Sequence, residues 1–321
     1  MSSTRLKDLP NEIITKVLSY LEIRDLFFFG HLSARTRAVS RDTILWQKVT
    51  IDNKTLATEF LKLILRNDCK FLKLTNVQIK GSLHLRKSSV LKKLSLNRCA
   101  INHRILEEFL GSCHSLTKLT LREIHVSHVN IKNLKKFVLQ NRTLQTLDLR
   151  TSKTLDLESI QFIINNCSDL TVLNLQRHPN DEYVLSDESI KYLTDNLSEK
   201  VEKLSLGYQR CVKDEHVVKL IARCKRLTEL NLNGTSISPN SLTCIIENLK
   251  HSLVILRLSN TKLTFDELFQ LRAMPKLRVL NCSHLLLDID NVKEYWPRFR
   301  KYTNKEILTA NFHVEGFEIT I

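Results

Sequence analysis

Basic side chains gather in one part of this chain, and the chemistry that they offer is anion binding. The 321 residues carry a net charge of +15, and residues 53–153 hold 20 basic but 6 acidic side chains. Four of the basic residues recur along this part of the chain. Lys118 follows Lys93 by 25 residues, Arg122 lies four residues after Lys118, and Arg150 follows Arg122 by 28 residues. Ammonium and guanidinium groups form charge-assisted hydrogen bonds with carboxylates and phosphates. The segment is therefore predicted to bind an acidic or phosphorylated protein.

Side chains that could act as nucleophiles or metal ligands show no comparable grouping. The eight cysteines form no C-x-x-C pair, and the histidines are scattered along the chain. The sequence contains no glycine-rich phosphate loop and no G-x-S-x-G elbow. We expect the cysteines to be reduced packing residues, as in a cytosolic or nuclear protein. The sequence predicts a protein that is not an enzyme and has neither a cofactor nor a metal site.

Leucine recurs along the chain in a fixed phase, which predicts the fold. The pattern L-x-x-L-x-L begins at Leu91 and returns in copies that end with the one starting at Leu277, while a weaker first copy starts at Cys69. The nine starts lie 22 to 31 residues apart, which is typical of leucine-rich repeats. The predicted fold class is α/β: a leucine-rich-repeat solenoid with a curved parallel sheet inside and helices outside, preceded by a small all-helical module.

Each repeat is expected to contain a short strand, a turn and a helix. The leucines at the fourth and sixth positions point to the core, so the residues between them point to the inner face of the sheet. An insertion at residues 177–185 is expected to add a binding element at one rim, or else to be a tolerated surface loop. The candidate substrate-binding residues are Lys93, Lys118, Arg122, Arg150, Arg177 and Lys203. The alternative is that these positions are polar simply because they are solvated.

The repeat phase divides the chain into four parts. Residues 1–51 form the helical module, residues 52–68 a linker helix into the solenoid, and residues 69–293 about nine repeats. Residues 294–321 leave the repeat phase as a C-terminal cap or tail, in which the partial alternation of residues 312–321 indicates an edge strand.

An amphipathic helix is predicted near the N-terminus. Pro10 suits the first turn of a helix, and one apolar stripe contains Ile13, Ile14, Val17, Leu18 and Leu21. A module of about 45 residues is too small to bury two or three such helices by itself. We therefore expect it to lay an apolar helix face against a partner.

Residues 6–51 resemble the F-box motif. The residues that carry the resemblance are Leu9-Pro10, Glu12-Ile13, Val17-Leu18, Tyr20-Leu21, Asp25-Leu26, Ser33, Arg35 and Leu45-Trp46. Ile23 and Thr36 depart from the proline and the tryptophan that are usual at these positions. Together with the repeats, the motif makes the chain similar to the F-box/leucine-rich-repeat family, close in layout to the S-phase kinase-associated F-box proteins.

The resemblance implies a substrate-recognition subunit of a Skp–cullin–F-box ubiquitin ligase. In that family the F-box docks on the Skp adaptor, which links it to a cullin, and the repeats hold the protein substrate for ubiquitination and proteasomal degradation. By carry-over, the adaptor contacts or their packing support are Leu9, Pro10, Ile13, Ile14, Val17, Leu18, Leu21, Leu26, Leu45 and Trp46.

Two other functions are compatible with the sequence: an F-box/repeat scaffold acting outside a ligase, and a basic protein that binds nucleic acid or chromatin. Aromatic residues make up 7% of the chain and do not alternate with basic ones as stacking platforms would. Nucleic acid is therefore the less favoured partner. No apolar run approaches the roughly 18 residues of a membrane span, so no membrane partner is expected, and the expected location is cytoplasmic and/or nuclear.

Overall fold

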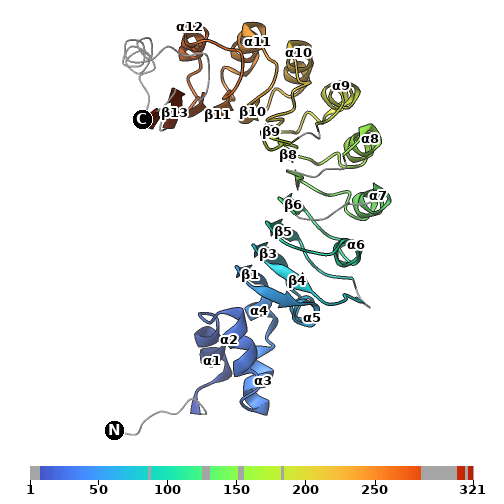
Figure 1. The fold of residues 1–321 in the computed structure, drawn as a ribbon. Helices are drawn as coiled ribbons and strands as arrows, with labels where there is room; N and C mark the ends of the chain where they lie inside the picture. Colours follow the sequence, from blue (N-terminus) through green and yellow to red (C-terminus); the bar gives the residue numbers. More distant parts are fainter. Residues whose placement is uncertain are drawn as a thin grey trace. The chain divides into compact units, whose positions relative to one another are not determined.

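The computed structural model describes residues 8–85, 88–124, 131–150, 155–181, 184–282, 309–314 and 317–320. The chain divides into two compact units, Met1–Val129 and Asn130–Ile321. The first unit begins with helices alone, and short parallel strands then alternate with helices in both units (Figure 1). The predicted α/β leucine-rich-repeat solenoid, preceded by a small all-helical module, is confirmed.

Four short helices open the first unit. They are α1 (Asn11–Leu18), α2 (Ile23–Phe29), α3 (Ala34–Ser40) and α4 (Thr43–Trp46). Trp46 is buried, and its Nε1 donates a hydrogen bond to the carbonyl of Ser40 at 2.7 Å. A capping box starts α3, because the Ser33 hydroxyl accepts from the Thr36 backbone at 3.1 Å while the Thr36 hydroxyl accepts from the Ser33 backbone at 2.8 Å. Thr36, which departs from the F-box pattern, thus has a role in helix initiation.

The parallel sheet of the first unit starts earlier than the repeat pattern predicts. Its strands, in order, are β1 (Lys48–Asp52), β3 (Phe71–Thr75), β5 (Lys93–Asn97) and β6 (Lys118–Arg122). The accompanying helices are α5 (Thr58–Arg66) and α6 (His103–Gly111), and β2 (Thr55–Ala57) pairs with β4 (Gln78–Lys80). The segment predicted as a linker helix, residues 52–68, therefore contains β2 as well as α5. Strand β1 occupies the last four residues of the predicted helical module, 48–51, and ends at Asp52, so it adds a strand ahead of the first predicted repeat.

The second unit repeats the same alternation. Its helices are α7 (Ile131–Gln140), α8 (Leu157–Asn166), α9 (Asp187–Asn196), α10 (Asp214–Arg223), α11 (Pro239–Leu249) and α12 (Phe265–Leu268), and a 3₁₀ helix follows at Phe269–Ala273. Its parallel strands are β7 (Thr146–Asp148), β8 (Val172–Asn174), β9 (Lys203–Ser205), β10 (Glu229–Asn231), β11 (Ile255–Arg257) and β12 (Val279–Asn281). The repeat leucines of these strands, such as Leu173 and Leu204, are buried, so the leucine phase defines the core.

Two further strands lie at the end of the second unit. Strand β13 (Thr309–Val314) pairs in parallel with β12, and β14 (Phe317–Thr320) then pairs with β13 in the antiparallel direction. The partial alternation of residues 312–321 thus corresponds to parts of a hairpin. The boundary predicted between residues 293 and 294 lies outside the described residues.

The cysteines of the protein are all free. Burial raises the pKa of the Cys69, Cys167 and Cys224 thiols to about 11, so these thiols are protonated at neutral pH. Across the described residues, no group of three or more histidine, cysteine or acidic side chains could hold a metal ion. None of the helices in those ranges is both long and apolar enough to cross a membrane.

Candidate functional site

The first candidate surface lies on α1. Ile13 and Val17 expose 46% and 50% of their area, and Leu21, just past the helix, exposes 39%. Ile13 and Val17 are four residues apart and therefore share one side of α1, and Leu21 follows Val17 at the same spacing. Polar solvent is an unfavourable environment for such a stripe, which makes it a candidate contact for another protein.

The residues predicted to contact the adaptor divide into two groups. Ile13, Val17 and Leu21 are exposed, as is Pro10 at the start of α1, whereas Leu9 and Leu45 are half-buried. The remaining residues are buried inside the helical module: Ile14, Leu18, Leu26 and Trp46. The buried group supports the surface from below, because it packs the helices that present the exposed group.

Four other exposed apolar side chains of the helical module were not among the predicted adaptor contacts. Tyr20, Phe28, Leu32 and Ile44 expose 82%, 54%, 72% and 62% of their area, respectively. A signal was present in the run Phe27-Phe28-Phe29, since three consecutive aromatic residues on one helix cannot all face a small core. Arg35 fixes the start of α1, as its Nε donates to Oδ1 of Asn11 at 3.0 Å and its Nη2 donates to the Leu9 carbonyl.

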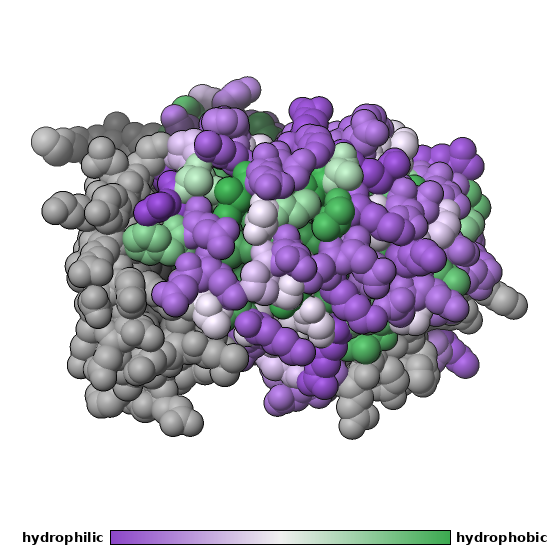
Figure 2. All heavy atoms as spheres, turned by 90° about the horizontal axis from the view of Figure 1, so that it is seen from above, coloured by the Kyte–Doolittle hydropathy of each residue, from purple (hydrophilic) through white to green (hydrophobic). Residues whose placement is uncertain are grey.

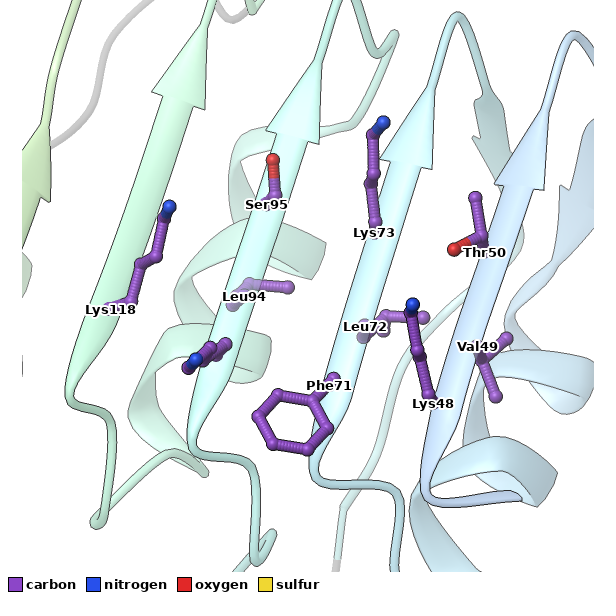
Figure 3. Close-up of a pocket in the computed structure, with 10 residues that line it drawn as sticks. Lys48, Val49, Thr50, Phe71, Leu72, Lys73, Leu94, Ser95 and Lys118 are labelled. Carbon is purple, nitrogen blue, oxygen red and sulfur yellow. The ribbon is translucent and has the colours of Figure 1, made fainter. Parts of the chain in front are cut away.

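The second candidate site is a pocket of about 400 Å³ on the sheet of the first unit, and Figure 3 shows its lining. Strands β1, β3, β5 and β6 all contribute to it. The lining residues are Lys48, Val49, Thr50, Phe71, Leu72, Lys73, Lys93, Leu94, Ser95 and Lys118. We call this the lysine pocket, because four of its side chains are lysines.

The strand register explains why these lysines meet. Lys48, Phe71, Lys93 and Lys118 occupy matched positions on four adjacent strands. Neighbouring strands are about 4.8 Å apart, so the row places Lys48 and Lys93 on either side of Phe71. Lys93 Nζ lies 5.1 Å from the centre of the Phe71 ring, within the range of a cation–π interaction. Lys73 lies two residues beyond Phe71 on the same face of β3.

The lysine pocket carries positive charge that is not neutralised locally. Within the described part of the chain, none of Lys48, Lys73, Lys93 and Lys118 forms an ion pair with a carboxylate. Side chains at matched positions on neighbouring strands interact directly, and like charges there are destabilising. Lys93 and Lys118 are matched in this way on β5 and β6, and an anion bound beside the four lysines would reduce the repulsion among their charges.

The structure brings together some of the predicted substrate-binding residues and not others. Lys93 and Lys118 line the lysine pocket, and Arg122 lies at the end of β6 in the same unit. Arg150 belongs to the second unit, where its Nε and Nη2 donate to the carboxylate of Asp148 at 3.2 and 3.1 Å. Lys203 forms an ion pair with Glu229. Their charges are thus already paired.

Arg177 differs from the prediction of an exposed contact, since 3% of its area is exposed. Burial lowers the pKa of its guanidinium, an effect that the nearby carboxylate of Asp181 opposes. Its burial follows from its place between two repeats. Arg177 lies three residues past the end of β8, and its backbone N–H donates to the Gly207 carbonyl at 2.9 Å, so the chain still runs beside the next repeat there.

Sequence reasoning also left Lys48 and Lys73 out of the candidate site. Lys73 was placed on the inner face by the repeat phase, but its role depends on its neighbours in space. Lys48 lies in β1, a strand that the leucine pattern did not reveal. The alternation of polar and apolar residues in Lys48–Asp52 was the available signal, and the structure shows the same alternation in exposure.

The equivalent sheet face of the second unit has a different chemistry. Gln176 accepts hydrogen bonds from Asn231 Nδ2 at 3.0 Å and from the Ser205 hydroxyl at 3.4 Å. Asn233 Oδ1 accepts from the backbone of Ser259 at 2.8 Å. These groups are neutral and largely satisfy one another. Figure 2 views the molecule from above and does not show this sheet face; on the face that it does show, hydrophilic side chains predominate and apolar ones are interspersed among them.

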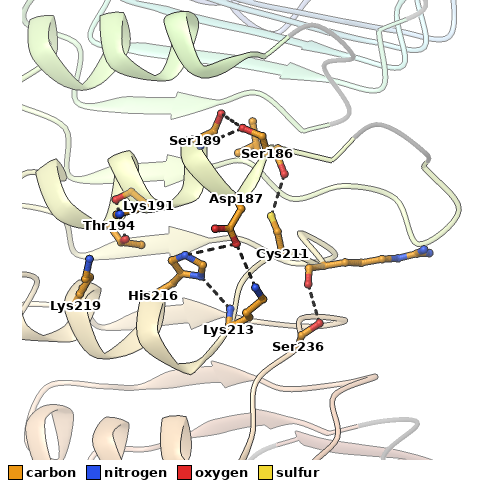
Figure 4. A network of polar contacts seen from close by, with 12 residues as sticks. Ser186, Asp187, Ser189, Lys191, Thr194, Cys211, Lys213, His216, Lys219 and Ser236 are labelled. Carbon is orange, nitrogen blue, oxygen red and sulfur yellow. Dashed lines mark hydrogen bonds and ion pairs between the residues drawn. The ribbon is translucent and has the colours of Figure 1, made fainter.

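A polar network joins the beginnings of helices α9 and α10 (Figure 4). The Asp187 carboxylate lies 3.5 Å from Lys213 Nζ and 3.9 Å from Nε2 of the buried His216. His216 Nδ1 in turn accepts from the Lys213 backbone at 3.2 Å. The network connects one repeat to the next, so we interpret it as structural.

Comparison with known proteins identifies a family match in the N-terminal part of the chain. Residues 6–52 match the family model described as F-box-like. A chain of the solved structure described as "Crystal structure of Rad7 and Elc1 complex in yeast" is similar over 87% of this chain and 90% of its own, with 14% sequence identity and a TM-score of 0.43. The exposed apolar helix α1 therefore lies within the segment that matches the F-box-like model, and the strands and helices of the repeats follow this segment.

Proposed function

We propose that this protein is the substrate-recognition subunit of a Skp–cullin–F-box ubiquitin ligase, working in the cytoplasm, the nucleus or both. The F-box-like domain docks on a Skp adaptor, and the repeats bind an acidic or phosphorylated protein substrate. The observation that carries this proposal is the exposed apolar stripe of Ile13, Val17 and Leu21 within a match to the F-box-like model. Such a stripe is the usual requirement for docking a helix against a partner.

The chain acts in this proposal by binding alone. Ubiquitin transfer requires a thiolate or a RING module, and a thiol is nucleophilic when its pKa is low. Burial instead raises the pKa of Cys69 and Cys167 to about 11 and that of Cys282 to about 12. These cysteines are suited to packing, so the catalytic components belong to other subunits.

The adaptor-binding surface is proposed to consist of the exposed residues of the F-box-like domain. Ile13, Val17 and Leu21 form its centre, and Pro10 with the half-buried Leu9 and Leu45 lies at its periphery. Ile14, Leu18, Leu26 and Trp46 support it from the interior. The substrate surface is proposed to include Lys93, Lys118 and Arg122, whereas Arg150 and Lys203 take part if their own carboxylate partners are displaced.

The proposal is tested by purifying the tagged full-length protein from cells and measuring which ligase subunits accompany it. We expect a Skp adaptor and a cullin together, and we expect ubiquitinated proteins to accumulate on the receptor when the proteasome is inhibited. Recovery of the adaptor with no cullin would favour a scaffold outside a ligase. Recovery of neither would refute the proposal.

A further inference from the structure

We propose that the lysine pocket recognises a phosphorylated side chain, phosphoserine or phosphothreonine, on the substrate. This inference rests on the proposed function, because it assumes that the repeats hold a protein. It goes further by assigning the recognition to one place, formed by Lys48, Lys73, Lys93 and Lys118 around Phe71, and by requiring a phosphate in place of acidic residues in general.

The charge of the pocket favours phosphate over carboxylate. Four lysines are among the residues that line a pocket of about 400 Å³, and among the described residues no carboxylate forms an ion pair with them. A phosphoryl group brings a charge of about −1.5 to −2 at neutral pH to a single point, whereas one aspartate or glutamate brings −1. A single phosphate therefore relieves more of the repulsion among the lysines than a single carboxylate does.

The donors of the pocket also match a phosphate. Each ammonium group offers three rotatable N–H donors, and a phosphoryl group offers three acceptor oxygens. Lys73 lies between Thr50 and Ser95 in the strand register, and Figure 3 shows it between these two hydroxyl side chains. The hydroxyls can donate further hydrogen bonds on the same face. The Phe71 ring supplies an apolar surface for the aliphatic part of the bound residue.

A nucleic-acid backbone is the other source of phosphate, and the site suits it less well. Single strands are held by several stacking aromatic side chains along a basic groove, whereas the pocket contains one aromatic residue, Phe71. A peptide carrying one phosphate needs no more than a single such site. We therefore assign the pocket to a phosphopeptide and treat nucleic acid as an outcome of the test.

The test uses the full-length protein together with its adaptor and a pool of peptides with one fixed phosphoserine and random flanking residues. Two matched pools carry serine or aspartate in place of the phosphoserine. We expect fluorescence anisotropy to show binding of the phosphorylated pool at least about tenfold tighter than of either matched pool, because several lysines each contribute roughly two- to fivefold. Free O-phosphoserine should compete better than serine.

Two double variants separate the pocket from the general charge of the sheet. Lys73→Gln/Lys93→Gln removes two charges from inside the pocket, on β3 and β5. Lys70→Gln/Lys92→Gln removes two charges from exposed positions that precede the same strands and do not line the pocket. We expect the first variant to lose most of the preference for phosphate and the second to keep it. All four positions are exposed, so both variants should fold, which circular dichroism verifies.

Three results would overturn the inference: equal binding of the phosphorylated and unphosphorylated pools, equal loss in the two double variants, or tighter binding of a random duplex DNA that displaces the phosphopeptides. Adaptor and cullin binding is measured on the same samples. If the ligase subunits bind while phosphate selectivity is absent, the pocket assignment is wrong and the proposed function stands. If the subunits fail to bind, the proposed function is wrong whatever the peptides do.

Discussion

The Ser241 hydroxyl donates a hydrogen bond to Oδ1 of Asp214 at 2.5 Å, which joins the first turns of α10 and α11. Asp214 also accepts from the backbone of Ser238 at 2.8 Å and from the Ser238 hydroxyl. The Asp214 carboxylate at the start of α10 thus accepts hydrogen bonds from Ser238 and Ser241 at the start of the next helix. Burial acts to raise the pKa of Asp214, but the hydrogen bonds from Ser238 and Ser241 outweigh it and lower the pKa below its usual value.

Asp214→Ala is expected to destabilise the repeats by about 1.5–3 kcal/mol at neutral pH, the usual contribution of hydrogen bonds to a charged group. The lowered pKa means that this stabilisation is fully present above the unfolded pKa of about 3.9 and is lost as the pH falls through the folded pKa. The difference between wild type and variant should therefore shrink in acid. Urea unfolding at neutral pH and at successively lower pH values measures it, with Glu215→Ala, an exposed residue of the same turn, as the control.

Val17→Glu should abolish adaptor binding while the F-box-like domain remains folded. Half of the area of Val17 is exposed, so a charge there costs little in the free protein. In the complex the same charge is buried without a partner, at a cost of about 2 kcal/mol or more, equivalent to roughly 30-fold in affinity. Pull-down of the purified adaptor provides the measurement. Lys16→Ala, on the same helix, serves as the control, and undiminished binding by Val17→Glu would exclude this surface.

Leu18→Ala is expected to act differently from Val17→Glu. Leu18 exposes 2% of its area, and truncating a buried leucine costs about 2–5 kcal/mol. The helical module should therefore unfold at lower temperature or lower denaturant concentration. Limited proteolysis should show cleavage within residues 8–46, with the repeats intact. Equal protease resistance of wild type and variant would show that Leu18 does not support the module.

Leu204→Asp should prevent the second unit from folding. Leu204 exposes 2% of its area and lies between Leu173 and Leu230 in the sheet register, so the substitution buries an unpaired charge between stacked repeats. Expression trials with centrifugation should recover the variant in the insoluble fraction. Val218→Asp introduces the same charge at a residue that exposes 45% of its area and should stay soluble. A soluble, protease-resistant Leu204→Asp variant would contradict the leucine phase.

The buried thiols make stability sensitive to alkali. Burial raises the pKa of Cys167 to about 11, above the usual value of about 8.5 in an unfolded chain. Its contribution is therefore complete below the unfolded pKa and is lost as the pH rises from there through about 11. In Cys167→Ala, which has no thiol to titrate, the unfolding free energy should decline less steeply over that window. Parallel curves for the two proteins would exclude a role for this thiol.

The leucine spacing was sufficient to predict the repeat fold because each leucine position has one direction relative to the core. Leu173, Leu204 and Leu230 occupy one row of the observed sheet, as their spacing predicts. Strand β1 was missed because Val49 and Ile51 carry the buried positions there, outside the longer leucine pattern. Strand β1 is recognised by its pairing with β3, a contact between two segments that are distant in sequence.

The candidate site was predictable in part, for a related physical reason. Strand period places Lys93 and Lys118 on the solvent face, so the direction of these two side chains follows from the sequence. Arg177 lies beyond the end of β8, and its burial was not predicted. Ion pairing does not follow from the sequence, because Lys203 meets Glu229 from a neighbouring repeat 26 residues away. Lys203 and Lys93 therefore contribute equally to the net charge of the sequence. In the structure, however, Lys203 pairs with a carboxylate, whereas Lys93 lies beside an aromatic ring.

The reversal of direction at β14 has a consequence for how such an array changes over evolutionary time. A new repeat produced by gene duplication needs a parallel strand as its neighbour, and each of β7 to β12 offers one. Strand β14 runs antiparallel to β13, so a repeat added after it would meet a neighbour of the wrong polarity. Duplications that lengthen the second unit are therefore expected to be internal, and they would alter the spacing between binding positions without altering this terminal hairpin.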